Sequence, residues 1–157
     1  MDEARARAVR LRRLGMAAAS YAFTLGMGVG CVAAGLLPWR LFAVYAAGVV
    51  GANLAFYALI HSGWSRRLED PSLTRPQIVG AMLLHMVPMS HGGAVRGPLL
   101  ILAALPFLYG LFRLGRAQLM ALGACYVGGY LAFLAALRAQ GQVLDPAVET
   151  LRTLALA

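Results

Sequence analysis

Charged residues are scarce in this chain. Only 13% of its 157 residues are Asp, Glu, Lys or Arg, and lysine does not occur at all. An ordinary soluble domain keeps roughly a quarter of its residues charged. Apolar side chains make up 61% of the sequence, and the few charges are bunched between long uncharged stretches. This composition excludes an ordinary soluble domain and predicts an all-α, polytopic membrane helix bundle.

Cysteine pairs and the residue patterns of enzymes are also missing. The two cysteines, Cys31 and Cys125, each fall inside an apolar stretch, and no CxxC or zinc-type Cys/His spacing occurs. A disulfide framework and a structural metal site are therefore unsupported. No Ser/His/Asp arrangement, phosphate-binding loop or pair of acids inside an apolar stretch is visible either. We therefore expect that this chain is not itself an enzyme.

Arginine accounts for all fourteen basic residues, and the net charge is +8. A strongly basic chain can indicate binding to nucleic acid. Here, however, the arginines stand at the ends of apolar stretches, where membrane topology places them. We therefore expect the lipid bilayer as a partner and no nucleic acid.

The apolar stretches predict five complete membrane spans. A span needs about 20 apolar residues to cross about 30 Å of hydrocarbon. After a basic arm at residues 1–14, the bundle at residues 15–157 begins. Its expected spans are 15–37, 41–63, 78–95, 99–112 and 117–137. Asp145-Pro146 with Glu149 predicts a further helix start. The sequence stops barely two turns later, so we expect a truncated sixth span in a longer protein.

The polar loop between the second and third predicted spans has helix-boundary signals. Asp70 followed by Pro71 fits an N-cap and first helical position, of one short turn. Thr74 with Gln77 three residues later fits a capping box at the start of the third span. With a cytoplasmic N-terminus, the arm and residues 64–77 and 113–116 place ten arginines inside and four outside. The positive-inside rule favours this orientation.

Methionine and histidine gather on one face of the third predicted span. Met82, His85, Met86 and Met89 are offset by 0, 3, 4 and 7 residues, so they share a helix face. Thioether and imidazole groups bind Cu(I) or haem iron, which makes this face a candidate metal or haem site. The simpler interpretation, which we favour, is that methionine fills packing gaps and His85 hydrogen-bonds a neighbouring helix.

Three other polar residues are candidates for contact with a small or hydrophobic signal molecule. Arg96 ends the third predicted span, where it either holds an anionic ligand or snorkels to the surface; we favour snorkelling. His91 points away from the methionine face toward the outer surface. Asn53, in the middle of the second span, fits an interhelical hydrogen bond better than ligand contact.

Several short motifs follow one another between residues 67 and 114. They read Arg-Leu-Glu-Asp-Pro-Ser-Leu-Thr at 67–74, Pro-Gln at 76–77, Arg-Gly at 96–97 and Tyr-Gly-Leu-Phe-Arg-Leu at 109–114. Together they resemble the N-terminal multi-span sensory region of bacterial diguanylate cyclases. The resemblance implies a sensor in the bacterial inner membrane, placed before a cytoplasmic GGDEF domain that makes cyclic di-GMP. This sequence has no GGDEF motif, so the output domain would lie outside it.

The resemblance also implies a homodimer, because an output domain of this kind needs two active sites facing each other. Gly26 and Gly30 are spaced for close helix contact. An alternative function is a small transporter or a substrate-binding membrane subunit. Pro88, the Gly-Gly pair at 92–93 and Pro106 would break short adjacent helices, as in transporter sites. No inverted repeat or mid-membrane acid supports that alternative.

Overall fold

The computed structural model describes residues 3–103, 105, 110, 114–142 and 144–155. Within these residues the regular elements are all helices, and no strand occurs. They are α1 (Glu3–Ala33), α2 (Trp39–His61), the 3₁₀ helix η1 (Trp64–Arg67), α3 (Thr74–Met89), α4 (Gly93–Ala103), α6 (Arg116–Ala139) and α7 (Pro146–Leu154). The predicted all-α class is confirmed.

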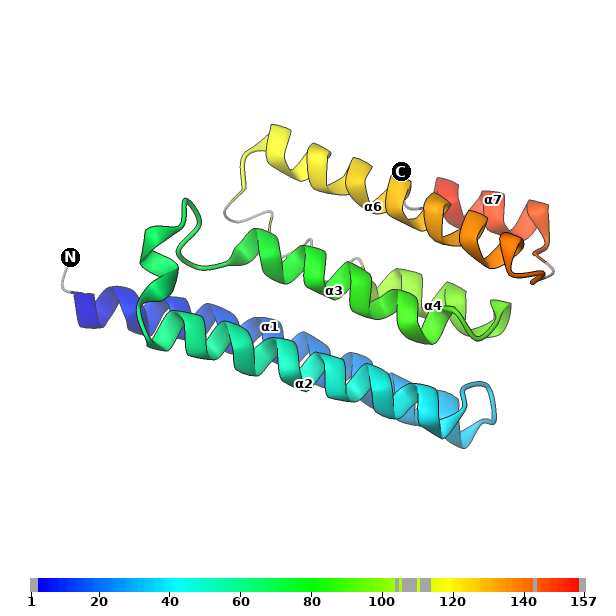
Figure 1. Cartoon of the computed structure of the whole chain (residues 1–157), viewed down its shortest axis with the longest axis horizontal. Coiled ribbons are helices and arrows are strands. Elements are labelled where there is room, and N and C mark those ends of the chain that lie inside the picture. The colour runs from blue at the N-terminus through cyan, green and yellow to red at the C-terminus, as the bar shows by residue number, and fades with distance from the viewer. Residues whose placement is uncertain (1–2, 104, 106–109, 111–113, 143, 156–157) are drawn as a thin grey trace.

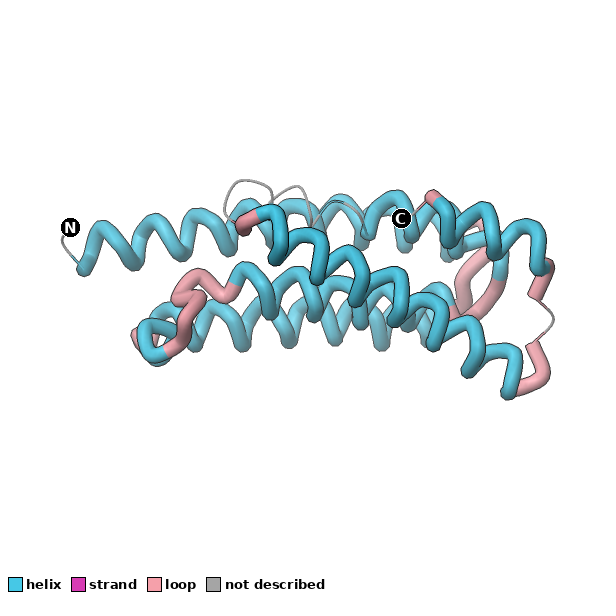
Figure 2. Tube along the Cα trace, turned by 90° about the horizontal axis from the view of Figure 1, so that it is seen from above, coloured by secondary structure: helices cyan, strands magenta, loops and turns pink. Residues whose placement is uncertain are grey.

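The helices lie side by side along the long axis of the molecule (Figure 1). α1 packs against α2, α2 against α3, and α3 against both α4 and α6. The N-termini of α1 and α6 and the segment between α2 and α3 lie at one end, here called the loop end. The α1–α2 turn, the break between α3 and α4 and the α6–α7 connection lie at the other, here called the corner end. The perpendicular view shows the same elongated arrangement (Figure 2).

Among the described residues, three helices are long and apolar enough to cross a membrane. They are α1 with 31 residues, α2 with 23 and α6 with 24. This number is smaller than the five complete spans predicted. Two of the three match the predicted spans 41–63 and 117–137 closely, since apolar length alone sets their bounds.

The third and fourth predicted spans have different bounds in the structure. α3 ends at Met89 after 16 residues, and α4 begins at Gly93 and continues through Pro98. The helix break therefore lies at Ser90–Gly92, beside the Gly-Gly pair at 92–93 that was expected to break the helix, and the second break expected at Gly97-Pro98 does not occur. A proline removes only one helical hydrogen bond, and the helix continues where packing holds the neighbouring turns. Much of the predicted span 99–112, including Pro106, lies outside the described residues, as do Tyr109, Leu111 and Phe112.

The basic arm and the first predicted span form one continuous helix. At 1.5 Å per residue, the 31 residues of α1 extend about 46 Å. Leu14 of this helix packs with Ile60 and Leu73 in a small apolar cluster at the loop end. This cluster anchors the N-terminal part of α1, which is expected to face the cytoplasm, to α2 and to the segment before α3. The arm therefore packs as part of the bundle.

The predicted capping box at Thr74 and Gln77 is wrong. The residue before α3 is Leu73, which has a left-handed φ of 56° and makes no side-chain cap. Instead, the carboxylate of Asp70 accepts hydrogen bonds from the backbone N–H groups of Ser72 (3.3 Å) and Arg75 (3.0 Å). Gln77 donates to the carbonyl of Ser72 at 2.9 Å. Asp70 and Pro71 do form the expected single turn, because the Leu73 N–H bonds the Asp70 carbonyl at 2.9 Å.

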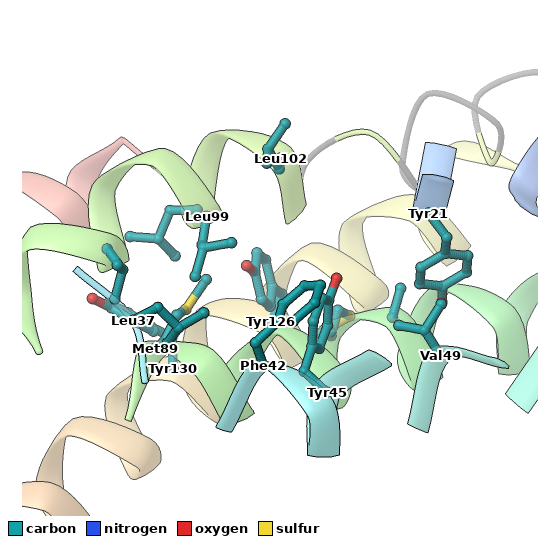
Figure 3. Packing of buried hydrophobic residues seen from close by; sticks show 14 of the residues in the cluster. Tyr21, Leu37, Phe42, Tyr45, Val49, Met89, Leu99, Leu102, Tyr126 and Tyr130 are labelled. Carbon is teal, nitrogen blue, oxygen red and sulfur yellow. The ribbon is translucent and has the colours of Figure 1, made fainter. Parts of the chain in front are cut away.

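The main core lies between the helices and is rich in aromatic rings (Figure 3). Phe42, Tyr45, Tyr126 and Tyr130 are all buried in it. Close helix approach occurs at Gly28, where an added Cβ would lie 2.6 Å from the Phe42 ring. The predicted close-contact residues Gly26 and Gly30 meet nothing within 4 Å, so they face away from the bundle.

Candidate functional site

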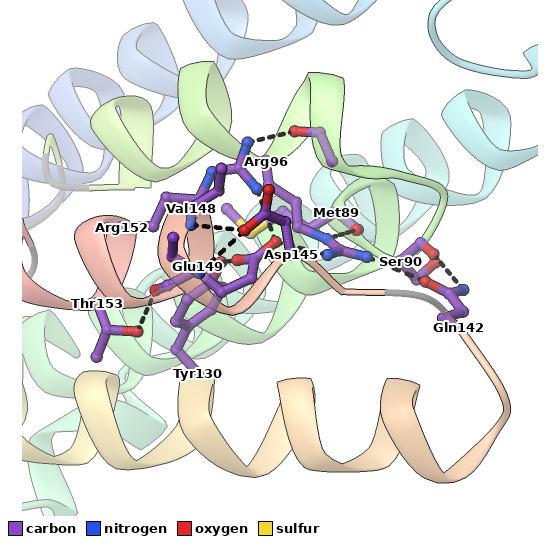
Figure 4. Close-up of polar contacts among 12 residues, drawn as sticks. Met89, Ser90, Arg96, Tyr130, Gln142, Asp145, Val148, Glu149, Arg152 and Thr153 are labelled. Atoms are coloured by element: carbon purple, nitrogen blue, oxygen red, sulfur yellow. Dashed lines mark hydrogen bonds and ion pairs between the residues drawn. The ribbon is translucent and has the colours of Figure 1, made fainter.

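A buried network of charges lies at the corner end and joins α4, α6 and α7 (Figure 4). Arg96 Nη1 donates to Glu149 Oε1 at 2.8 Å, and Arg152 Nη1 donates to the same oxygen at 2.7 Å. The Tyr130 hydroxyl donates to Glu149 Oε2 at 2.8 Å. The Arg96 and Glu149 side chains are only 3% and 9% exposed. We call these four residues the Glu149 network.

Arg96 also closes the end of α3. Its Nε donates to the Met89 carbonyl at 3.0 Å, and its Nη2 donates to Gln142 Oε1 at 3.0 Å. Gln142 in turn donates to the Ser90 carbonyl at 3.0 Å. The last carbonyls of a helix have no partner within it, so side chains that reach them stabilise its end. One arginine therefore connects the break between α3 and α4 to the segment that leads into α7.

Local sequence signals position Glu149. The Asp145 carboxylate accepts from the N–H groups of Ala147 (3.0 Å) and Val148 (3.3 Å), and Pro146 is the first residue of α7. This helix start agrees with the prediction. Glu149 lies one turn further, on the face of α7 that meets α4 and α6. Arg152 lies three residues after it and also donates to the Gly93 carbonyl at 2.7 Å.

The energetics of the Glu149 network fit a structural or switching role. Removing charges from water is costly, and a buried ion pair is tolerated when hydrogen bonds satisfy both partners. Here both carboxylate oxygens accept bonds, and each nitrogen of the Arg96 guanidinium has an acceptor. The network holds α7 against the bundle.

The structure places the three predicted ligand-contact residues apart. Arg96 is buried at 2% exposure, so the favoured interpretation of a snorkelling surface charge is wrong. His91 is exposed at the break after α3. Asn53 donates to the Val49 carbonyl of its own helix at 2.9 Å, and it lines a groove between α1 and α2.

The predicted methionine face lies mostly in the core. Met82, His85 and Met89 are buried, and Met86 is half-buried. His85 Nδ1 bonds the Ala81 carbonyl at 2.7 Å, and its ring lies 5.8 Å from that of Tyr45, edge-on. In the described part of the chain no three His, Cys, Asp or Glu side chains gather where they could hold a metal ion. A metal or haem here remains a prediction that an absorption spectrum would test.

The sequence motifs did not predict that Glu149 is the partner of Arg96. They predicted Glu149 only as an acid in the first turn of a helix. A signal was present, because Arg96 is the only charged residue between Arg75 and Arg113. A lone charge in a long apolar stretch needs a counter-charge, and only Asp145 and Glu149 are acids after Asp70.

Comparison with known proteins gives no further assignment. No protein-family model, no curated protein and no solved structure matches this chain.

Proposed function

We propose that this chain is a membrane-embedded signal-input module. It has five spans, lies in the bacterial inner membrane, and regulates a cytoplasmic output domain. The sequence motifs at 67–74 and 96–97 support a diguanylate cyclase as that output. The observation that carries the proposal is the Glu149 network, which couples α7 to α4 and α6.

The coupling has a physical basis. α7 is the last helix before the expected output domain, and it rests on the bundle chiefly through Glu149 and its partners. A buried ion pair does not stretch gradually, because a half-broken pair leaves a charge desolvated and unpaired. Packed elements of this kind have two discrete arrangements. A signal that moves α4 or α6 would therefore shift α7 between a docked and an undocked position.

A substitution that removes the charge of Glu149 tests this proposal. In the full-length protein, Glu149→Gln should change the rate of cyclic di-GMP synthesis and its response to the signal. Glu3→Gln is a matched control, because the Glu3 side chain is 55% exposed and pairs with Arg10 at the loop end, far from α7. If both variants fold and synthesise cyclic di-GMP like the parent, the proposed coupling through α7 is wrong.

The proposed topology places the loop end in the cytoplasm. The ten-to-four distribution of arginines supports this orientation. The N-terminus and the segment around Ser72 lie at the same end of the bundle (Figure 1). A Ser72→Cys variant should react with an impermeant thiol reagent only after the membrane is opened. Reaction in intact cells would reverse the topology.

The module is proposed to work as a homodimer. Gly26 and Gly30 lie on a face of α1 that nothing in the described chain covers, and small residues allow close contact between helices. Cysteines introduced at these positions should form disulfide-linked dimers in native membranes. Only monomers under these conditions would count against the dimer.

A small transporter remains the second candidate. The short helices α3 and α4 meet at a break close to buried charges, which is a feature of transporter sites. Purified protein in sealed vesicles should then move a solute across the bilayer. Cyclic di-GMP synthesis by the full-length protein would favour the sensor instead.

A further inference from the structure

A groove with a volume of about 460 Å³ lies between α6 and α7. This volume lies within the range of about 300–1,000 Å³ that small-molecule sites occupy. Leu131, Leu134 and Ala135 line it from α6, and Leu154 lines it from the last turn of α7. Leu131 and Leu154 are 49% and 67% exposed, so the groove walls are open to an incoming apolar molecule.

Arg138 gives this groove a charged end. α6 runs toward the corner end and α7 runs back from it (Figure 1). Arg138 and Leu144 therefore lie at the corner end of the groove, and Leu131 and Leu154 lie further along the bundle. From Leu131 to Arg138 is seven residues, or about 10 Å of helix. The groove is thus long, apolar along its length and cationic at one end.

Among the described residues, Arg138 has no carboxylate within ion-pair distance. Arg96 and Arg152, in contrast, both form ion pairs with Glu149. Three arginines, Arg96, Arg138 and Arg152, and two acids, Asp145 and Glu149, lie in or next to the groove. Their net charge is therefore +1. The Asp145 carboxylate is engaged as the cap of α7. A single negative charge is therefore the complement that this end of the groove requires.

We propose that the groove between α6 and α7 binds a single-chain anionic amphiphile, a long-chain carboxylate supplied from the membrane phase. Its carboxylate pairs with Arg138, and its chain lies along Leu131, Leu134 and Leu154. The ligand would be the signal that the module detects. Its role in regulation therefore rests on the proposed function. One chain rather than two fits a groove near the small end of the usual range, with one unpaired arginine.

Glu149 connects this ligand to the switch. Its side chain lines the same groove whose apolar walls hold the chain of the amphiphile. A bound chain fills the space between α6 and α7 and excludes water from the side of the Glu149 network that is still partly exposed, at Arg152. Weaker screening strengthens the attraction between Glu149 and its arginines. The ligand should therefore favour the docked position of α7.

Photo-crosslinking tests the site directly. The full-length protein is placed in phosphatidylcholine nanodiscs and exposed to palmitic acid that carries a diazirine, and the labelled residues are mapped by mass spectrometry. We expect labels to concentrate in residues 131–138 and 144–154. Unlabelled palmitate should compete, whereas hexadecanol, which has the same chain without the charge, should not. Uniform labelling along α1, α2 and α6 would overturn the proposal.

Two variants separate charge from shape. Arg138→Gln should lower labelling about tenfold, the change expected when one charge-assisted pair worth about 1.4 kcal/mol is lost. Arg138→Lys should retain most of it. Arg40→Gln is the matched control, because Arg40 is also exposed, is the second residue of α2, which begins at the corner end, and has no carboxylate partner in the described chain. Ala135→Phe keeps the charge but fills the groove, and it should also block labelling.

The outcomes are decisive for a folded protein, checked by its helical circular dichroism and its elution as a single species. Equal labelling of Arg138→Gln and Arg40→Gln would exclude the carboxylate site. If a diazirine-bearing phosphatidylglycerol labels the groove more strongly than palmitic acid does, the occupant is a bilayer lipid and not a free long-chain carboxylate. Labelling that is intact while cyclic di-GMP synthesis ignores palmitate would contradict the sensor function and leave the binding site standing.

Discussion

The two ends of the bundle use the same kinds of charged residues in opposite ways. At the loop end, Glu3 pairs with Arg10 at 2.7 Å; the Arg10 side chain is only 11% exposed, but the Glu3 side chain is 55% exposed. Glu69, which lies 3.8 Å from Arg75, is 92% exposed. At the corner end, Arg96 and Glu149 pair at 2.8 Å with exposures of 3% and 9%. Distances alone would rank the Glu3 and Glu149 pairs as equals.

The difference lies in the solvent. Water and salt screen the exposed pairs at the loop end, so each contributes about 0–1 kcal/mol. That end is held instead by apolar contacts of Leu14, Ile60 and Leu73. Water does not reach Arg96, so every hydrogen-bonding group there must be satisfied by protein. An ion pair is therefore informative about function only when its burial is known.

The largest effect is expected from breaking the buried pair. Glu149→Ala leaves Arg96 desolvated and removes the acceptor for Arg152 and Tyr130. We expect a loss of about 3–5 kcal/mol in the free energy of unfolding. Unfolding in mixed micelles of mild and denaturing detergent would measure it. The matched control Glu3→Ala should lose no more than about 1 kcal/mol. Equal losses would remove the distinction between the two ends.

Replacing both partners sharpens the same comparison. Arg96→Met combined with Glu149→Leu removes two buried charges and keeps similar volume, while the partly exposed Arg152 stays in contact with water. Apolar replacements of buried pairs are often neutral or stabilising. The double variant should therefore be more stable than Glu149→Ala. A loss equal to the sum of the single variants would show that the two residues act independently.

A smaller effect is expected at Tyr130, whose hydroxyl donates to Glu149 at 2.8 Å. Tyr130→Phe removes one hydrogen bond to a charged group, which is worth about 1.5–3 kcal/mol. Detergent unfolding would again report it. Tyr57→Phe is the control, because Tyr57 is 47% exposed and its ring stacks on His61. If both variants lose the same stability, Tyr130 is not part of a buried polar network.

A still smaller effect is expected at the cap of α3. Asp70→Ala removes the acceptor for two backbone N–H groups, Ser72 and Arg75, and should cost about 0.5–2 kcal/mol. Thr74→Ala should change stability little, because its side chain makes no cap. A larger loss of stability in Thr74→Ala than in Asp70→Ala would support the capping box expected from the sequence. Thermal unfolding followed by circular dichroism would distinguish the two.

The smallest effect is expected from salt. In about 1 M salt the Debye length falls to about 3 Å, so exposed pairs are screened and buried ones are not. The difference in stability between the parent and Glu69→Gln should vanish at this salt concentration. The difference between the parent and Glu149→Ala should persist. A buried-pair effect that disappeared with salt would mean that water enters the corner end.

Much of the fold could be predicted from the sequence where short-range rules apply. The spans 41–63 and 117–137 lie within two residues of α2 and α6, because length and apolar content fix them. The capping box at Thr74 failed because Leu73 is buried in a left-handed conformation that tertiary packing imposes. The break at Ser90–Gly92 falls at the Gly-Gly pair expected to cause it, whereas the break also expected at Gly97-Pro98 does not occur, since proline marks only one of several positions where a helix can end.

The sequence by itself determined the helical class, the approximate bounds of α2 and α6 and the start of α7 at Asp145-Pro146. Each of these depends on residues that are neighbours along the chain, so local physics decides them. Only the tertiary structure decided that Arg96 meets Glu149, 53 residues later in the chain. It also decided that Gly28, and not Gly26 or Gly30, lies against Phe42. Burial and pairing depend on which helix faces meet, and a charge has its large effect only after that meeting removes water from it.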